Sequence, residues 1–242
     1  MNVGSLFTGI GGFDLGLERA GMRVIWQCEQ DEFCRRVLAR HWHDVPCYPD
    51  VCEISAGTVD RVDVLCGGFP CQPVSSAGHR LAQRDARWLW PEFARLIGDL
   101  RPQYVLVENV SGLLARGLGD VLGDLASVGF DAEWDCVPAG AFGAPHARDR
   151  VWLVAYPHSV VGEARVRCLA ERPWPIPAAD SGDRPAVWMD APPGPRGVAD
   201  GIPDRVDRTR ALGNALVPQI AEWIGRQVME HERLVSVVRE AA

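Results

Sequence analysis

The chain has 242 residues, of which 47% are hydrophobic and 24% charged, a balance typical of a soluble protein with one domain or one domain plus a small appendage. Its net charge of −7 argues against a diffuse polycation that coats nucleic acid but leaves room for a local basic cleft. No apolar run approaches the ~20 residues of a membrane span, and the N-terminus lacks the basic segment of a secretion signal, so we expect a cytoplasmic protein with no membrane contact.

The first 156 residues alternate short β-branched runs with stretches of helical periodicity, the pattern of a doubly wound α/β domain with a mostly parallel sheet. Strands are predicted at Asn2–Phe7, Met22–Cys28, Val62–Cys66, Tyr104–Glu108, Phe130–Val137 and Val151–Tyr156. Helices are predicted at Phe13–Ala20, Glu32–His41, Pro91–Leu100 and Leu118–Val128. Pro91 suits the first position of its helix, because proline has no backbone N–H to contribute.

Proline marks the segment that departs from this pattern. Half of the 18 prolines lie between Pro157 and Pro203. Since proline breaks helices and is excluded from central strands, this stretch is predicted to be an irregular insertion. Helical periodicity returns at Leu216–Glu230. The predicted division is therefore a main domain of residues 1–156 and 209–242, interrupted by a small region at 157–208.

A glycine-rich turn, FTGIGGF at residues 7–13, joins the first predicted strand to the first helix. Such a turn brings backbone amides close to a nucleotide-like ligand, although a turn without a ligand can have the same sequence. Glu29 ends the second strand 18 residues beyond Gly11, where a carboxylate can accept hydrogen bonds from both ribose hydroxyls. Asp50 and Val51 follow the position of a third strand and offer an acceptor and an apolar face for adenine. A ribose and an adenine are implied, and a pyrophosphate is not.

A second loop carries a cysteine at the same predicted edge of the sheet. The sequence GGFPCQP at 67–73 follows a strand, so Cys71 lies where open α/β folds keep their active sites. The next strand delivers Glu108 and Asn109 to this edge. A thiolate paired with a carboxylic acid is suited to addition across an activated double bond. None of the eight cysteines forms a CxxC pair, so neither structural zinc nor a disulfide framework is expected.

Five blocks in order resemble the DNA (cytosine-5) methyltransferase family, in its compact bacterial or phage form. They are SLFTGIGGF at 5–13, GGFPCQPVSSAG at 67–78, ENV at 108–110, PHARDR at 145–150 and GNALVPQ at 213–219. The combination of PCQ, ENV and a terminal GNA is highly specific. The resemblance implies the fold of S-adenosylmethionine-dependent methyltransferases, a catalytic and cofactor-binding domain at 1–156 and 209–242, and a reduced target-recognition region at 157–208.

The resemblance also implies a catalytic set. Cys71 would attack C6 of a cytosine flipped out of the duplex, and Glu108 would contact N3 and the 4-amino group and protonate N3. Arg150 would hold Glu108 and the base oxygen, while Pro70 and Asn109 would shape the pocket. The covalent addition is needed because C5 of cytosine is a poor nucleophile until C6 carries the thiolate.

By the same resemblance, the cofactor is S-adenosyl-L-methionine and the partner is double-stranded DNA, with no metal. The implied cofactor contacts are Phe7, Gly9, Gly11, Glu29, Asp50, Leu89 and Asn214. The expected DNA contacts are Gln72, Ser75 and Arg148, together with the insertion arginines Arg165, Arg167, Arg184 and Arg196, which are suited to phosphates or guanine edges. The protein is expected to be a monomer, and a cognate restriction endonuclease is a candidate partner.

Three features depart from the family pattern. His146 stands where Gln is usual, and Gln30 stands where a Trp that can stack on adenine is common. The region at 157–208 is far shorter than many recognition domains, and acidic residues are interspersed among its arginines. A solvated charged loop and a base-reading segment therefore remain equally open interpretations of this region.

Two other functions remain open on sequence grounds. An RNA cytosine-5 methyltransferase would share these blocks, although the intact PCQ favours DNA over the tRNA-acting branch. A non-catalytic DNA-binding relative would retain the fold, but the presence of Cys71, Glu108 and Arg150 argues against it.

Overall fold

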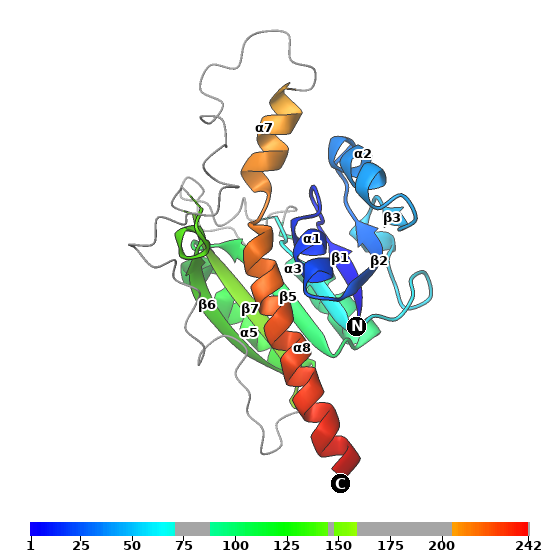
Figure 1. Cartoon of the computed structure of the whole chain (residues 1–242), viewed down its shortest axis with the longest axis vertical. Helices are drawn as coiled ribbons and strands as arrows, with labels where there is room; N and C mark the ends of the chain where they lie inside the picture. Colours follow the sequence, from blue (N-terminus) through cyan, green and yellow to red (C-terminus); the bar gives the residue numbers. More distant parts are fainter. Residues whose placement is uncertain (71–87, 145–147, 159–204, 242) are drawn as a thin grey trace.

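The computed structural model of the chain describes residues 1–70, 88–144, 148–158 and 205–241. These residues form a seven-stranded sheet in the order β3-β2-β1-β4-β5-β7-β6 (Figure 1). The strands are β1 Asn2–Leu6, β2 Arg23–Cys28, β3 Cys47–Tyr48, β4 Val64–Gly67, β5 Tyr104–Val110, β6 Phe130–Pro138 and β7 Asp149–Pro157. Strands β3, β2, β1, β4 and β5 are parallel to one another, and within this sheet β7 is the reversed strand, antiparallel to both β5 and β6. The predicted doubly wound, mostly parallel sheet is therefore confirmed.

The strand order places a switch point at the middle of the sheet. From β1 the chain moves outward through β2 and β3, and then returns to pair β4 with the other side of β1, where Leu6 lies opposite Gly67. Ligands of open α/β sheets bind at such a point, beyond the carboxyl ends of the strands. The glycine-rich turn after β1 and the loop after β4 both begin there.

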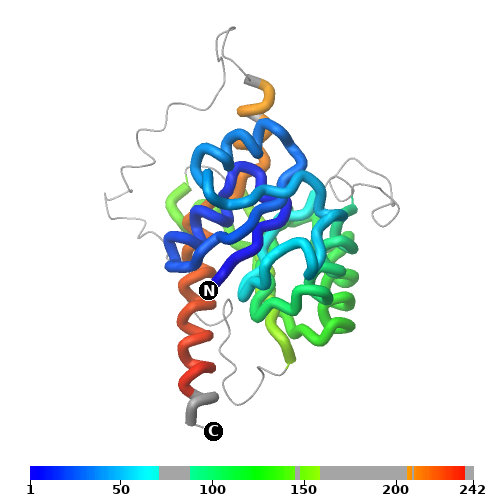
Figure 2. The backbone as a smooth tube through the Cα atoms, turned by 90° about the vertical axis from the view of Figure 1, so that its right-hand side faces the viewer, coloured from blue at the N-terminus to red at the C-terminus, as the bar shows by residue number. Residues whose placement is uncertain are grey.

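Helices cover both faces of the sheet. The helices are α1 Gly12–Arg19, α2 Glu32–His41, α3 Trp90–Leu100, α4 Leu113–Arg116, α5 Leu118–Ser127, α7 Arg205–Asn214 and α8 Pro218–Ala241, with short 3-10 turns η1 Val51–Glu53 and η4 Ala139–Phe142. Figure 2 shows α8 on the opposite side of the molecule from the segment that contains α3 and α5. Within the described residues, no helix is both long enough and apolar enough to span a membrane.

Two hydrophobic clusters fill the space between sheet and helices. On one face, Phe13 and Leu17 of α1 and Ile224 of α8 pack on buried strand residues such as Val64 and Leu106. On the other, the apolar sides of α3 and α5 pack on the alternate strand residues, Val105 and Val107 among them. Each fully buried side chain of this kind stabilises the fold by about 1.5 to 3 kcal/mol.

The predicted elements occur with small shifts in their ends. Helix α2 has the predicted limits because Asp31 caps its N-terminus, with the side chain accepting a hydrogen bond from the Cys34 amide. Strand β5 continues past Glu108 to Val110, because the antiparallel ladder with β7 extends that far. Helix α8 runs beyond Glu230 to Ala241. The sequence interpretation did not include β3 as a defined strand, η1, α4, η4 or α7.

Candidate active site

Strand β5 delivers two polar side chains to the carboxyl edge of the sheet, on opposite faces. Because side chains alternate along a strand, Asn109 lies on the face of Val107 and Glu108 on the face of Leu106. Asn109 is buried, and its Nδ2 donates a hydrogen bond to the carbonyl oxygen of Phe69 at 3.2 Å. The asparagine therefore ties β5 to the loop after β4, one residue before Pro70 and two before Cys71.

Aromatic packing surrounds Phe69, in the described first part of this loop. The buried Phe69 ring meets Trp88 nearly edge-on, with ring centroids 5.2 Å apart, and also lies 5.4 Å from the Trp90 ring. Phe69 precedes and Trp88 follows the stretch 71–87, so this contact joins the two ends of that stretch. The predicted nucleophile Cys71, with Gln72 and Ser75, lies outside the described residues.

Glu108 forms an ion pair with an arginine from the neighbouring antiparallel strand. Glu108 faces Trp152 across the ladder, so Arg150 is its diagonal neighbour. Arg150 Nε lies 3.1 Å from Glu108 Oε1, and the carboxylate is almost completely buried. Burial raises the pKa of Glu108 to about 7, since the positive charges of Arg150 and Arg148 only partly offset the loss of hydration.

The Glu108 carboxyl group still has unused hydrogen-bonding capacity. Its Oε1 has no geometrically good hydrogen bond within the described part of the chain, because the 3.1 Å approach of Arg150 is not aligned as one. A buried polar atom left in this state is costly unless a further partner reaches it. The carboxyl therefore fits a role in binding a polar substrate edge.

Arg148, predicted as a DNA contact, lies near Glu108 and contacts helix α7. Its Nη1 donates to the carbonyl oxygen of Gly213 at 2.9 Å. Burial and the neighbouring Arg150 charge lower the pKa of Arg148 below its usual value. Its Nε is buried without a partner among the described residues. Arg148 thus links β7 to the end of α7, next to Asn214.

Glu29 lies at the tip of β2 and binds the glycine-rich turn. Its Oε2 accepts a hydrogen bond from the Gly9 amide and its Oε1 from the Asp31 amide, both at 2.7 Å. These bonds fix both carboxylate oxygens while each keeps lone pairs available. The geometry is suited to acceptance of two further hydrogen bonds, as from the hydroxyls of a ribose.

The turn itself has a backbone arrangement that leaves room for a ligand. Phe7 has a φ of 52°, a left-handed conformation that is uncommon for an aromatic residue and concentrates at functional sites. Gly9 also has a positive φ, and a Cβ placed on it would have no neighbour within 4 Å. The open space beside Gly9 could hold the nucleoside part of S-adenosylmethionine, and the Glu29 carboxylate could bind its ribose. Gly11 differs, because a Cβ there would lie 2.4 Å from the Trp42 ring.

A network of buried polar side chains stabilises the glycine-rich turn. Asp14 in the first turn of α1 accepts hydrogen bonds from Ser5 Oγ at 2.9 Å and from Gln27 Nε2 at 2.7 Å. Thr8 Oγ1 bonds Ser5 and the Cys28 carbonyl. Burial raises the pKa of Asp14 to about 6. Sequence reasoning missed this network, although polar Ser5 and Gln27 inside otherwise apolar strands were a usable signal.

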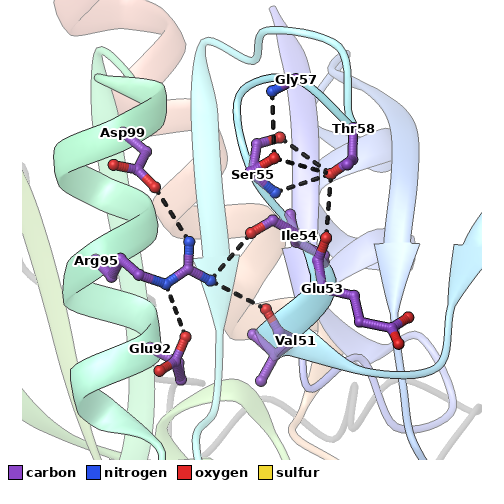
Figure 3. Close-up of polar contacts among 9 residues, drawn as sticks. All are labelled: Val51, Glu53, Ile54, Ser55, Gly57, Thr58, Glu92, Arg95 and Asp99. Atoms are coloured by element: carbon purple, nitrogen blue, oxygen red, sulfur yellow. Dashed lines mark hydrogen bonds and ion pairs between the residues drawn. The ribbon is translucent and has the colours of Figure 1, made fainter.

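An arginine on α3 holds the loop that contains the predicted adenine contacts (Figure 3). Arg95 Nη2 donates to the carbonyl oxygens of Val51 at 3.3 Å and Ile54 at 3.0 Å, while Glu92 and Asp99 bind its other nitrogens. Asp50, the first residue of this loop, is exposed and accepts a hydrogen bond from the Cys52 amide. Sequence reasoning did not identify this role of Arg95, because the main-chain carbonyls of Val51 and Ile54 carry no sequence signal.

The other predicted cofactor positions lie around the same edge. Leu89, which precedes α3, and Phe7 pack against one hydrophobic cluster. Asn214 ends α7 and is exposed. Two residues later, Leu216 lies so close to Gly12 that a Cβ on that glycine would approach it to 2.9 Å. The segment after α7 therefore lies directly beside the glycine-rich turn.

Four more of the predicted DNA contacts cannot be placed. Arg165, Arg167, Arg184 and Arg196 lie outside the described residues. Among the residues that are described, no group of three or more His, Cys, Asp or Glu side chains is placed to hold a metal ion.

Comparison with known proteins shows which family the chain belongs to. The model of the C-5 cytosine-specific DNA methylase family matches residues 1–175, which is more than two thirds of the chain. The chain belongs to this family. The match includes the glycine-rich turn, the PCQ loop, the Glu108 strand and Arg150.

Individual methylase relatives show the same likeness over part of their length. Type II methyltransferase M.DsaV of Dactylococcopsis salina is 32% identical over 156 residues, which cover 62% of this chain and 44% of the relative. M.AplI of Arthrospira platensis is 29% identical over 224 residues, which cover 91% and 57%. The chain thus spans about half the length of the curated relatives it matches.

Solved structures agree on the fold. A protein described as a DNA modification methyltransferase encoded within an E. coli prophage superposes with a TM-score of 0.56 at 27% identity, covering 66% of this chain and 47% of that one. A Spodoptera frugiperda DNMT2 mutant superposes with a TM-score of 0.55 at 18% identity, over 69% and 53%. The second likeness concerns the fold alone.

Proposed function

We propose that this member of the DNA methylase family transfers a methyl group from S-adenosylmethionine to C5 of cytosine in double-stranded DNA. The observation that carries the proposal is the buried Glu108–Arg150 pair beside an anchored loop that leads into Cys71. The pair and loop come from β4, β5 and β7 at the carboxyl edge of the sheet.

In this proposal, Glu108 acts as the acid that activates the base. With a pKa of about 7, a substantial fraction of Glu108 is protonated at neutral pH and can give its proton to N3 of cytosine. As N3 gains the proton, the Cys71 thiolate forms a bond to C6, and the ring electrons shift to C5. Once C5 has taken up the methyl group, a water molecule would accept the C5 proton, the C5–H electrons would restore the C5–C6 double bond, and the C6–S bond would break to return the thiolate. N3 would then give its proton back to Glu108.

Arg150 would play two parts in this chemistry. It limits the rise in the pKa of Glu108 caused by burial, and a guanidinium N–H that is not directed at Glu108 would donate to the base oxygen. When bound, S-adenosylmethionine supplies an electrophilic methyl group. Glu29, Gly9 and Phe7 would hold its nucleoside, with Asp50, Leu89 and Asn214 around it.

We further propose that residues 157–208 select the DNA sequence. Residues around the extruded cytosine contact that base and cannot report on its neighbours, which must be read in a groove. The region contains several arginines and few other candidates for base contact. Since each good contact discriminates by about 1 to 3 kcal/mol, the site should be short, on the order of two to four base pairs.

The proposal extends to the setting of the reaction. We infer a monomer that acts on duplex DNA in the cytoplasm. The type II names of the relatives support a place in a restriction-modification system, with a restriction endonuclease of matching specificity as the partner.

Bisulfite sequencing of a plasmid from cells that express the protein tests the function. The proposal predicts protected cytosines in one short context, and none with Cys71→Ser. Protection of host tRNA without protection of the plasmid would assign the activity to RNA, and no protection in either would contradict a cytosine methyltransferase.

A further inference from the structure

Helix α7 is attached to both halves of the candidate site by arginines. In the C-terminal half of α7, Arg210 Nη2 lies 2.6 Å from Asp31 Oδ2, at the start of α2. Within the next turn of the helix, the Gly213 carbonyl accepts a hydrogen bond from Arg148 Nη1. The first contact reaches the loop that follows β2, and the second reaches the strand of Arg150. Figure 1 shows α7 and α2 at the same end of the molecule.

Asp31 connects the first contact to the predicted ribose site. Its Oδ1 caps α2 by accepting from the Cys34 amide, and its own amide donates to Glu29 Oε1 at 2.7 Å. The other oxygen of Glu29 accepts from Gly9. A continuous series of polar contacts therefore runs from α7 through Asp31 and Glu29 to the glycine-rich turn.

Apolar packing does little to position α7. Among the side chains of α7 that the structure describes, Ala211 alone is buried, while Val206 and Leu212 are 77% and 64% exposed. The described side chains of α7 therefore bury little apolar surface against the domain. Asp207, one turn earlier, lies 3.0 Å from Arg210 Nη2 and orients the guanidinium toward Asp31. Two polar contacts in its C-terminal half, at Arg210 and Gly213, therefore contribute most to the placement of the helix.

We infer that the Arg210–Asp31 ion pair is a positioning contact for the cofactor, which holds α7 and its terminal Asn214 against the Glu29 side of the site. This inference rests on the proposed function, because it assumes that Glu29 and Asn214 contact one ligand. An exposed ion pair contributes little to the stability of the fold. Its effect should therefore be seen in ligand binding more than in the melting temperature.

A double-mutant cycle with Arg210→Gln and Asp31→Asn tests the pair. Asparagine retains a side-chain oxygen that can cap α2, so Asp31→Asn removes the charge and keeps the cap. The matched control is Arg226→Gln on α8, where Arg226 is similarly exposed and lies 2.7 Å from Glu222. Binding of S-adenosylmethionine is measured by isothermal titration without DNA, and melting temperatures are recorded for every variant.

We expect each single variant to bind S-adenosylmethionine about two- to fivefold more weakly than the parent, the range of an exposed ion pair. The double variant should bind no more weakly than either single variant, since the pair is lost once. Arg226→Gln should match the parent. Added salt should weaken binding by the parent more than by the double variant, because salt screens the pair.

The outcomes separate this inference from the proposed function. Parent-like affinity in both single variants, or additive losses in the double variant, would overturn the inference and leave the function standing. A fall in melting temperature that accounts for the weaker binding would overturn it as well, by showing a structural effect. A parent that binds no S-adenosylmethionine would overturn the function and the inference together.

Discussion

Burial and a neighbouring guanidinium act on Glu108 in opposite directions, and burial prevails. The pKa rises from 4.5 to about 7, although Arg150 and Arg148 both favour the charged form. A group whose pKa lies near the working pH can both hold and release a proton, which is the property that general acid catalysis requires. The strained Phe7 is a second residue whose conformation points to function.

The raised pKa of Glu108 predicts how stability depends on pH. Between pH 4.5 and about 7 the folded protein holds a proton that the unfolded chain has released, so the free energy of unfolding falls as the pH rises through this window. Glu108→Gln cannot titrate and escapes this loss. The unfolding free energy of the variant minus that of the parent should therefore be about 1 to 3 kcal/mol larger at pH 8 than at pH 5. Denaturant titrations of both proteins at the two pH values measure this change.

The exposed Glu32 provides the control for this measurement. Glu32→Gln removes a carboxylate that is 76% exposed, so it controls for the loss of a glutamate charge that is not buried. Asp14 also titrates with a raised pKa, but it is present in all three proteins and its contribution cancels. If the unfolding free energy of Glu108→Gln differed from that of the parent by the same amount at both pH values, the assigned pKa would be contradicted.

Asn109 should matter for both stability and catalysis. Asn109→Leu would leave the buried Phe69 carbonyl without its donor, at a cost of about 1 to 3 kcal/mol in unfolding free energy. The loop that leads to Cys71 would lose its tie to β5, so the rate of methyl transfer should fall while binding of S-adenosylmethionine is retained. Steady-state kinetics and titration of the variant check both. An unchanged rate would show that this bond does not position the loop.

At the scale of elements, the close contact of α1 and α8 depends on glycine. A Cβ on Gly16 would lie 2.4 Å from the Pro218 carbonyl oxygen and 2.6 Å from the Ala221 Cβ. Backbone cannot yield as a flexible side chain can, so Gly16→Ala should push the helices apart. Since Leu216 of the same segment lies beside Gly12, the displacement would reach the glycine-rich turn.

Gly16→Ala and Gly123→Ala form a matched pair with opposite expected signs. Gly16→Ala should destabilise by about 1 to 3 kcal/mol through overpacking. Gly123 lies inside α5 with open space around its Cβ position, so Gly123→Ala should stabilise by about 0.5 to 1 kcal/mol, the helical preference for alanine. Thermal unfolding of the two variants tests the pair. Destabilisation of similar size in both would contradict the packing argument.

Elements were predictable where periodicity and capping residues coincide. Glu32–His41 could be read because Asp31 caps a helix with an apolar stripe. Helix α7 could not, because it lacks an apolar stripe and begins at Arg205, just after a proline-rich stretch. The two residues of β3 depend on pairing with the end of β2, and such a pairing leaves no local pattern.

At the scale of the molecule, the sequence predicted which residues gather at the site better than how they are held. Glu29, Glu108 and Arg150 were named from motifs, and the sheet order explains why they share an edge. Their supports were not foreseen, since Asp14 and Arg95 act through buried side chains and main-chain carbonyls that are distant in sequence. The division into 1–156 with 209–242 and 157–208 stays a prediction, and α7 crosses its second boundary.

An arginine scan of the predicted recognition region tests that division. Arg165, Arg167, Arg184 and Arg196 are replaced one at a time by Ala, and the methylated positions are sequenced. Loss of a base contact should relax the context at one position, and loss of a phosphate contact should weaken binding uniformly. If all four variants keep the parent's context and affinity, residues 157–208 do not read the sequence.

The most direct test of the central claim is trapping of the covalent intermediate. A duplex with 5-fluorocytosine at the methylated position is incubated with the protein and S-adenosylmethionine, then analysed under denaturing conditions, because fluorine at C5 prevents the proton loss that releases Cys71. The account predicts a denaturation-resistant complex with the parent and none with Cys71→Ser, since a hydroxyl is a far weaker nucleophile than a thiolate. An adduct of equal yield in Cys71→Ser, or no adduct from a parent that methylates the unmodified duplex, would contradict it.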